Sequence, residues 1–202
     1  MTSTPHKAPW LLARSAQVAI AAAAVADLFR ATALRESYLD PTPANDLAAA
    51  QASMVMGSLM LLATVLFLTW LVRSRRIAEQ VSPDAPLPGA GWTVGAWFVP
   101  VANLFVPRRF LLDIGRATSA TWTNKRDSAL VNNWWAAWIG HALFLAVFGQ
   151  MAPGSLAVLV VAQVLMFAAA VLAGLMIQRL TTLQSSAATH TTAAPGTPVA
   201  QA

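Results

Sequence analysis

Long runs of apolar residues, separated by short polar segments, dominate the chain. A helix crosses a bilayer with about 20 apolar residues at a rise of about 1.5 Å per residue, and four of the runs are long enough. The predicted spans cover residues 10–33, 47–72, 130–148 and 155–180. They predict one helical membrane domain over residues 10–184, with flexible tails at residues 1–9 and 185–202.

The composition excludes most soluble classes of protein. Hydrophobic residues make up 57% of the chain and charged residues only 10%, whereas a soluble domain has about a quarter charged residues. A net charge of +5 would suit nucleic acid in a soluble protein, but here it reflects the Lys and Arg of cytoplasmic loops. We therefore expect the lipid bilayer as a partner and no nucleic acid. The chain has no Cys, which excludes disulfides, thiolate metal sites and thiol catalysis.

Two charged residues interrupt the first apolar run. Asp27 is costly in hydrocarbon, but Arg30 lies three residues on, on the same helix face, where it can pair with the carboxylate near the membrane boundary. A cleaved signal peptide is the alternative interpretation of this run. Val18–Val25 would be its apolar core, and Ala24 and Ala26 would form an A-x-A cleavage site.

The distribution of Lys and Arg predicts the orientation of the spans. Arg73, Arg75 and Arg76 follow the second run, which places the end of that run on the cytoplasmic side. Counting spans from there puts all but Arg30 and Arg35 of the 13 Lys and Arg residues inside. The expected topology is a multi-pass protein of the cell membrane with both termini in the cytoplasm.

Residues 92–122 do not fit a single crossing in this topology. Basic residues flank the segment at both ends, so a fifth span over 92–107 would place them on opposite sides, against the positive-inside bias. That stretch is also short for a span, and Pro100 and Pro107 each remove a backbone donor. Broken backbone at membrane depth is tolerated where it packs on protein or lines a polar cavity. We expect a re-entrant or interfacial hairpin between the second and third spans.

An amphipathic helix is predicted at the end of this hairpin, over residues 108–122. Proline suits the first position of a helix, and the apolar residues that follow repeat at helical spacing. Such a stripe is typical of a helix that lies in the membrane interface. The stripe consists of Pro107, Phe110, Leu111, Ile114 and Ala117.

Four charged residues of this helix are candidates for ligand binding. Arg109, Asp113 and Arg116 share the face opposite the apolar stripe, and Arg108 precedes them. One interpretation is an ordinary solvated charge stripe. The other is an anion site for a lipid headgroup or phosphate, formed by the three arginines near the membrane surface.

Two further polar residues are expected at membrane depth. Asn103 stands between the two prolines, where its amide either satisfies freed backbone groups or orients a substrate. His141 is the only histidine within a predicted span, and an intramembrane ionisable residue is a functional candidate by default. It is either a hydrogen-bonded packing residue or a group that transfers protons or binds a ligand.

Tryptophans and small residues predict how the spans meet their surroundings. Trp134, Trp135 and Trp138 open the third span and are expected to form an interfacial aromatic belt. Small residues recur at four-residue spacing in the second span, as in a surface for close helix packing or oligomerisation. This stripe consists of Ala49, Ser53 and Gly57.

The sequence contains none of the common catalytic motifs. It has no H-E-x-x-H, no phosphate-binding loop, no G-x-S-x-G and no pair of intramembrane acids. We therefore expect no enzymatic activity, no cofactor and no metal.

The stretch WFVPVANLFVPRRFLLDIGRAT at residues 97–118, with the later tryptophan pair, resembles the bacterial multi-pass membrane family catalogued as domain of unknown function 4328. The resemblance covers most of the chain. Gly115 departs from the pattern, since the resemblance implies a Trp before the arginine at 116. No activity comes with the family, so the resemblance supports the membrane prediction and the importance of the hairpin. It falls on Trp97, Pro100, Asn103, Pro107, Arg116, Trp134 and Trp135.

The sequence thus predicts an all-α integral membrane protein with four transmembrane helices, a proline-broken hairpin and an amphipathic helix. The expected function is that of a non-enzymatic scaffold or regulator that binds a lipid, a partner protein or a second copy of itself. The alternative is a small-molecule or ion transporter or channel, with its site where Asn103 meets His141.

Overall fold

The computed structural model describes residues 8–123 and 125–192, and this part of the chain is helical without strands. Four helices are long. They are α1 (Trp10–Leu39), α2 (Pro43–Val81), α6 (Lys125–Met151) and α7 (Leu156–Thr192). Shorter elements connect α2 to α6. They are α3 (Ala90–Gly95), α4 (Pro100–Asn103), α5 (Val106–Thr118) and the 3-10 turn η1 (Ala120–Thr123).

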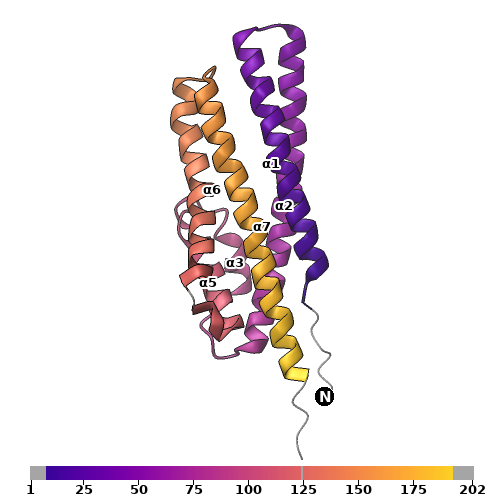
Figure 1. Cartoon of the computed structure of the whole chain (residues 1–202), viewed down its shortest axis with the longest axis vertical. Coiled ribbons are helices and arrows are strands. Elements are labelled where there is room, and N and C mark those ends of the chain that lie inside the picture. The colour runs from indigo at the N-terminus through magenta and orange to yellow at the C-terminus, as the bar shows by residue number, and fades with distance from the viewer. Residues whose placement is uncertain (1–7, 124, 193–202) are drawn as a thin grey trace, which may run out of the picture.

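The long helices form two antiparallel pairs that lie side by side (Figure 1). α1 packs along α2, α6 packs along α7, and α1 also packs against α7. α2 and α6 make no extended contact within the described residues. The short helices α3 and α5 lie toward the end of the molecule where α1 begins and α7 ends (Figure 1).

Small side chains allow α1 to lie close to its neighbours. Its buried residues are almost all alanines, spaced three or four positions apart, as in closely packed membrane helices. The small-residue stripe predicted in α2 behaves differently. Ala49 is buried, but Gly57 is exposed, and a Cβ added there would meet nothing.

The helices continue beyond the apolar runs that predict them. α1 ends at Leu39 rather than near residue 33, and α2 covers 43–81 rather than 47–72. α7 extends to Thr192, so residues 185–192 are helical where a tail is predicted. Apolar character marks the part of a helix that suits hydrocarbon, whereas Ala, Arg, Glu and Gln also extend helices in water. Residues 1–7 and 193–202 of the predicted tails lie outside the described part of the chain.

Three helices in the described residues are long and apolar enough to cross a membrane. They are α1, α2 and the Leu156–Ala187 part of α7. α6 contains the third predicted span, residues 130–148, and is not among them. Its lower hydropathy follows from the polar residues Asn132, Asn133 and His141 within that span.

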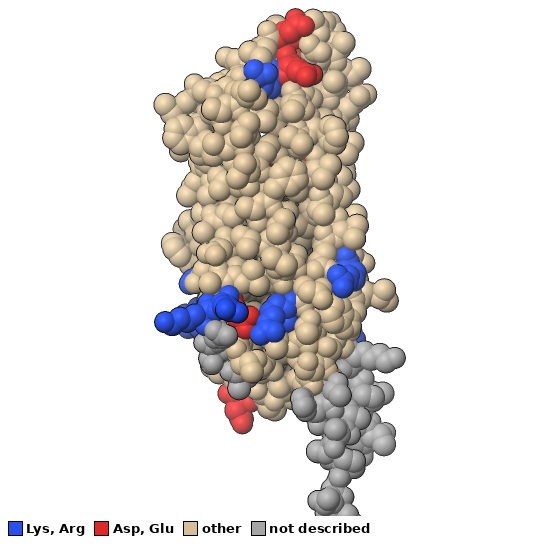
Figure 2. All heavy atoms as spheres, viewed as in Figure 1, with Lys and Arg blue, Asp and Glu red and all other residues tan. Residues whose placement is uncertain are grey.

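Charged side chains gather at the two ends of the face shown in Figure 2, and the band between them is uncharged. The turn between α1 and α2 carries acidic residues at one end. Lys and Arg dominate the other end, which we call the basic end (Figure 2). α5, the C-terminal part of α2 and the start of α6 lie toward this end (Figure 1). Their basic residues include Arg73, Arg108, Arg109, Arg116, Lys125 and Arg126.

Candidate functional site at the broken hairpin

Helices α3, α4 and α5 form a hairpin that returns to the end of α2. The Ser82 hydroxyl, just after α2, donates to the carbonyl oxygen of Ala117 near the end of α5, at 2.8 Å. Pro100 begins α4, and Pro107 lies in the first turn of α5. Each proline therefore stands where a helix starts, a position that needs no intrahelical N–H donor.

A cluster of aromatic rings holds the hairpin between α2 and α6. The ring centroid of Trp97, just after α3, lies 5.4 Å from that of Phe67 on α2. It lies 6.4 and 6.0 Å from the centroids of Trp134 and Trp135 on α6. Aromatic pairs at such separations stabilise by about 0.5–1.5 kcal/mol each beyond their buried area.

The tryptophans of α6 lie in the protein interior rather than in a surface belt. Trp134 is 5% exposed and Trp135 is 6% exposed, and Trp138 is half-buried. The belt prediction is wrong for the first two. The reason is tertiary: the hairpin packs on this face of α6 and removes the rings from the lipid boundary.

Two polar contacts fasten the hairpin to α6. Trp135 Nε1 donates to the carbonyl oxygen of Leu104 at 3.0 Å, which satisfies a backbone acceptor in the break between α4 and α5. Arg108 Nε donates to Asn132 Oδ1 at 2.8 Å. Arg108, one of the three candidate anion-binding arginines, is thus engaged in holding the start of α5.

The amphipathic stripe of α5 is buried, but against protein. All five predicted positions, from Pro107 to Ala117, are buried, and α5 packs on α2, α6 and α7. The interfacial prediction placed this face against lipid. The periodicity indicates which face is apolar, and only the neighbouring helices determine what covers it.

The opposite face of α5 carries the exposed charges. The Arg109 side chain is 81% exposed and that of Arg116 is 55% exposed. Asp113 pairs with both: Arg116 Nη1 lies 3.0 Å from Asp113 Oδ1, and Arg109 Nε lies 3.7 Å from Oδ2. The structure thus brings these three residues together at the surface of the basic end.

Two buried polar atoms of the hairpin have no hydrogen-bond partner among the described residues. They are Asn103 Oδ1 and Trp97 Nε1. A buried polar atom without a hydrogen-bond partner costs free energy, because the bonds that it made to water are not replaced. Asn103 therefore does not satisfy the freed backbone groups with its oxygen.

His141 does not join this constellation. Its Nδ1 forms a hydrogen bond with the carbonyl oxygen of Ala162 on α7, at 3.0 Å. No hydrogen bond links it to Asn103 in the described part of the chain. This contact supports the interpretation of His141 as a hydrogen-bonded packing residue. No contact among the described residues supports the predicted site where Asn103 meets His141.

The charged pair predicted in α1 is confirmed and has a third member. Asp27 is fully buried, and Arg30 Nη2 lies 2.7 Å from its Oδ1. Gln163 of α7 donates from Nε2 to Asp27 Oδ2 at 3.0 Å. The pair lies well inside α1 rather than near the helix end. Sequence spacing identifies Arg30, but no local pattern identifies a partner 136 positions away.

An ion pair between distant segments lies at the basic end. Arg179 of α7 donates from Nε and Nη2 to the two carboxylate oxygens of Asp127 at 3.0 and 3.1 Å. Asp127 is the first-turn acid of α6. No local pattern predicts this pair, since in the sequence Asp127 is one more charge in a polar turn and Arg179 one more charge at a helix end.

Packing explains why residue 115 is a glycine in this chain. The indole of Trp122 in η1 is fully buried, and a Cβ added at Gly115 would overlap its ring. The bulk that the family pattern implies at residue 115 is therefore supplied by Trp122 from the neighbouring turn. Among the described residues, no three His, Cys, Asp or Glu side chains gather as metal ligands.

Comparison with known proteins identifies the family without adding an activity. No curated protein and no solved structure matches the chain. The family model for domain of unknown function 4328 matches residues 35–182, which include the hairpin, the aromatic cluster and the Asp127–Arg179 pair. The chain therefore belongs to the family described as domain of unknown function 4328.

Proposed function

We propose that the protein is a multi-pass protein of the bacterial cell membrane with four transmembrane helices and a hairpin that re-enters from the basic, cytoplasmic side. α6 crosses the membrane together with α1, α2 and α7, because it runs antiparallel along the apolar helix α7 (Figure 1). The uncharged band between two charged ends supports this placement (Figure 2). The Ser82–Ala117 hydrogen bond supports re-entry, because it joins the end of α2, which precedes the hairpin, to the last turn of α5, where the hairpin returns. Both termini then lie in the cytoplasm.

We further propose that the protein is a non-enzymatic scaffold or regulator that binds an anionic lipid headgroup at the basic end. The observation that carries this proposal is the outer face of α5. Arg109 and Arg116 are exposed there, while the other face of the helix is held by protein. Basic side chains at a cytoplasmic membrane surface attract anionic lipids with about 1 kcal/mol each. The alternative occupant of this face is a partner protein with an acidic surface or a second copy of the chain.

Native mass spectrometry of protein released from mild detergent tests the lipid proposal. The wild type is compared with Arg109→Ala/Arg116→Ala, and we expect a bound anionic lipid that the double variant loses. The matched control is Arg73→Ala/Arg76→Ala, which removes two exposed cations from α2 at the same end and should keep the lipid. A wild type without lipid, or an adduct that Arg109→Ala/Arg116→Ala retains, removes the headgroup site and directs the search to protein partners.

A small-molecule or ion transporter is the second candidate function. The observation in its favour is the fully buried carboxylate of Asp27, between α1 and α7 in the proposed membrane region. Charged groups there are costly and often mark transport paths. The test is a solute or proton flux assay in vesicles. Loss of flux in Asp27→Asn, with wild-type flux in Arg109→Ala/Arg116→Ala, would favour transport over headgroup binding.

A further inference from the structure

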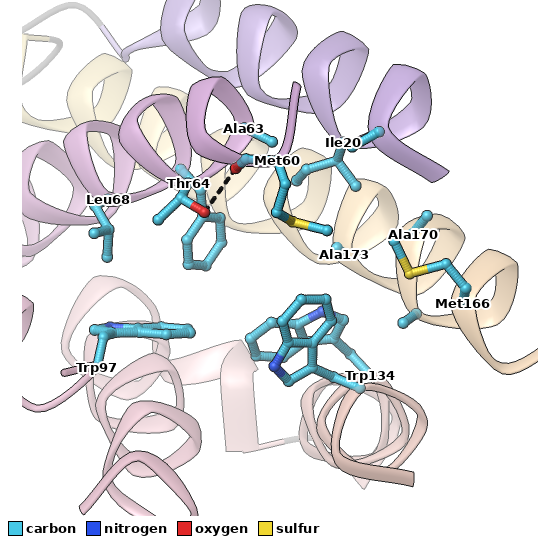
Figure 3. Close-up of a pocket in the computed structure, with 14 residues that line it drawn as sticks. Ile20, Met60, Ala63, Thr64, Leu68, Trp97, Trp134, Met166, Ala170 and Ala173 are labelled. Carbon is cyan, nitrogen blue, oxygen red and sulfur yellow. Dashed lines mark hydrogen bonds between the residues drawn. The ribbon is translucent and has the colours of Figure 1, made fainter. Parts of the chain in front are cut away.

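A cavity of about 120 Å³ lies between the long helices, and the hairpin forms part of its wall. Figure 3 shows Trp97 and Trp134 on one side of it and Ile20, Met60 and Ala63 on the other. Met166 and Ala170 of α7 also line it. Small side chains of α1, α2 and α7 leave this space, because they do not fill the gap between the helix axes. These are Ala23, Ala63, Ala169, Ala170 and Ala173.

The wall of the cavity is apolar. The Thr64 hydroxyl donates to the carbonyl oxygen of Met60 at 2.8 Å and is therefore occupied. Trp97 contributes its ring to the wall, but its Nε1 is buried so completely that it offers no donor to the cavity. A molecule that fits this wall is hydrocarbon where it enters the cavity.

The arrangement of the helices determines from where such a molecule enters. α1 and α7 close the back of the cavity, while α2 and α6 stand at its sides without an extended contact between them. Between α2 and α6, the rings of Phe67, Trp97 and Trp134 contact one another. Both helices also carry exposed apolar side chains such as Leu61 and Leu143, as expected of side chains that face lipid. The side of the cavity between α2 and α6 is therefore the open one, and in the proposed membrane it faces hydrocarbon.

We propose that this cavity binds an alkyl chain of a membrane amphiphile. A dry cavity of about 150 Å³ in another protein takes up benzene, so about 120 Å³ accommodates a short length of chain. An empty apolar void forfeits the dispersion contacts that the chain supplies. The site rests on the membrane placement proposed above and on the cavity with its apolar wall, and it is independent of the arginines of α5.

Photolabelling of the full chain in phosphatidylcholine nanodiscs tests the proposal directly. The probe is an uncharged medium-chain alkyl methyl ester with a diazirine at the end of the chain. In the wild type we expect saturable labelling of the cavity residues Met60 and Met166, and competition by the same ester without the diazirine. Labelling confined to lipid-facing positions such as the exposed Val164, rising linearly with probe, would overturn the proposal. This readout needs no variant to fold.

Two variants localise the site further. Ala170→Phe fills the cavity, and we expect labelling of Met60 and Met166 to fall about tenfold, because overpacking excludes the chain. Its control, Val171→Phe, adds the same ring at an exposed position of α7 and should label as the wild type does. Equal labelling in both variants would overturn the proposal.

The two ligand proposals separate in the same assay. Arg109→Ala/Arg116→Ala should label with the uncharged ester as the wild type does, because no headgroup charge is involved. Loss of labelling in that double variant, with full labelling in Ala170→Phe, would overturn the cavity site. Saturable labelling of the cavity in a protein that carries no anionic lipid would support the cavity site after the headgroup proposal had failed.

Discussion

Two aspartates at the basic end each pair with arginine, yet the pairs differ in what they connect. Asp127 is 7% exposed and receives two hydrogen bonds from Arg179, so it joins the start of α6 to α7. Asp113 pairs with Arg109 and Arg116 of its own helix, at an exposed surface. The first pair connects two helices, and the second connects none.

This difference separates a structural pair from a candidate binding surface. Exposed pairs within one helix contribute only about 0.3–0.5 kcal/mol to stability. Such a pair therefore does little for the fold, and its arginines have most of their donors free for an anion. A pair between helices with a buried carboxylate holds tertiary structure, so its arginine is not available in the same way.

Asp27 extends the comparison into the proposed membrane region. Its first partner, Arg30, comes from its own helix as for Asp113, but the carboxylate is fully buried and receives a further hydrogen bond from Gln163 of α7. The burial of the carboxylate, rather than its separation in sequence from its partner alone, therefore determines how much each aspartate contributes to the stability of the fold.

The largest effect is expected for Asp27→Asn. The substitution leaves the largely buried Arg30 guanidinium without a counter-charge, and breaking a buried pair in this way costs about 3 kcal/mol. The double variant Asp27→Asn/Arg30→Gln removes both charges and should recover most of that loss. Unfolding titrations with a denaturing detergent measure both free energies. A double variant as unstable as the single one would show that charge pairing is not the cause.

A smaller effect is expected for Asp127→Ala, which removes two hydrogen bonds to a charged group between α6 and α7. Because the Arg179 side chain is 41% exposed and water screens it, we expect a loss of about 1–2 kcal/mol in the free energy of unfolding. Hydrogen exchange should also rise at the start of α6. An unchanged free energy of unfolding would mean that this pair, like the pairs of Asp113, does little for the fold.

The smallest effect on stability is expected for Asp113→Ala, less than about 0.5 kcal/mol. Binding of an anionic lipid should instead become tighter, by a few fold, because the carboxylate no longer competes for Arg109 and Arg116. Lipid adducts in native mass spectra measure this change. Weaker lipid binding in Asp113→Ala would mean that the aspartate positions the arginines, which would sharpen the site rather than remove it.

Local patterns predicted the features that depend on neighbours within one helix. The apolar runs predicted the membrane-capable helices α1, α2 and α7, which are found. The spacing of three predicted the pairing of Asp27 with Arg30. The periodicity after Pro107 predicted the buried face of α5 in full. These succeed because a helix places residues three and four positions apart on one face, whatever surrounds it.

Other features required contacts between segments that are distant in the sequence. The sequence predicts a surface belt at Trp134 and Trp135, but in the structure the hairpin covers both rings. The sequence likewise presents Arg108 as a free cation, but in the structure it donates a hydrogen bond to Asn132. Gln163 and Arg179 meet their aspartates only when α7 packs against α1 and α6. The cavity exists because alanines of α1, α2 and α7 face one another once the helices have packed and do not fill the space between them.

The sequence alone therefore determined that the chain is helical and apolar enough for a membrane, and it determined where its charges lie along each helix. The tertiary structure decided which of those charges are used internally and which remain exposed. The physical reason is the separation along the sequence of the residues that determine each property. Apolarity and helical periodicity are properties of a few consecutive residues, whereas burial and hydrogen-bond partners depend on segments that meet only after the helices have packed.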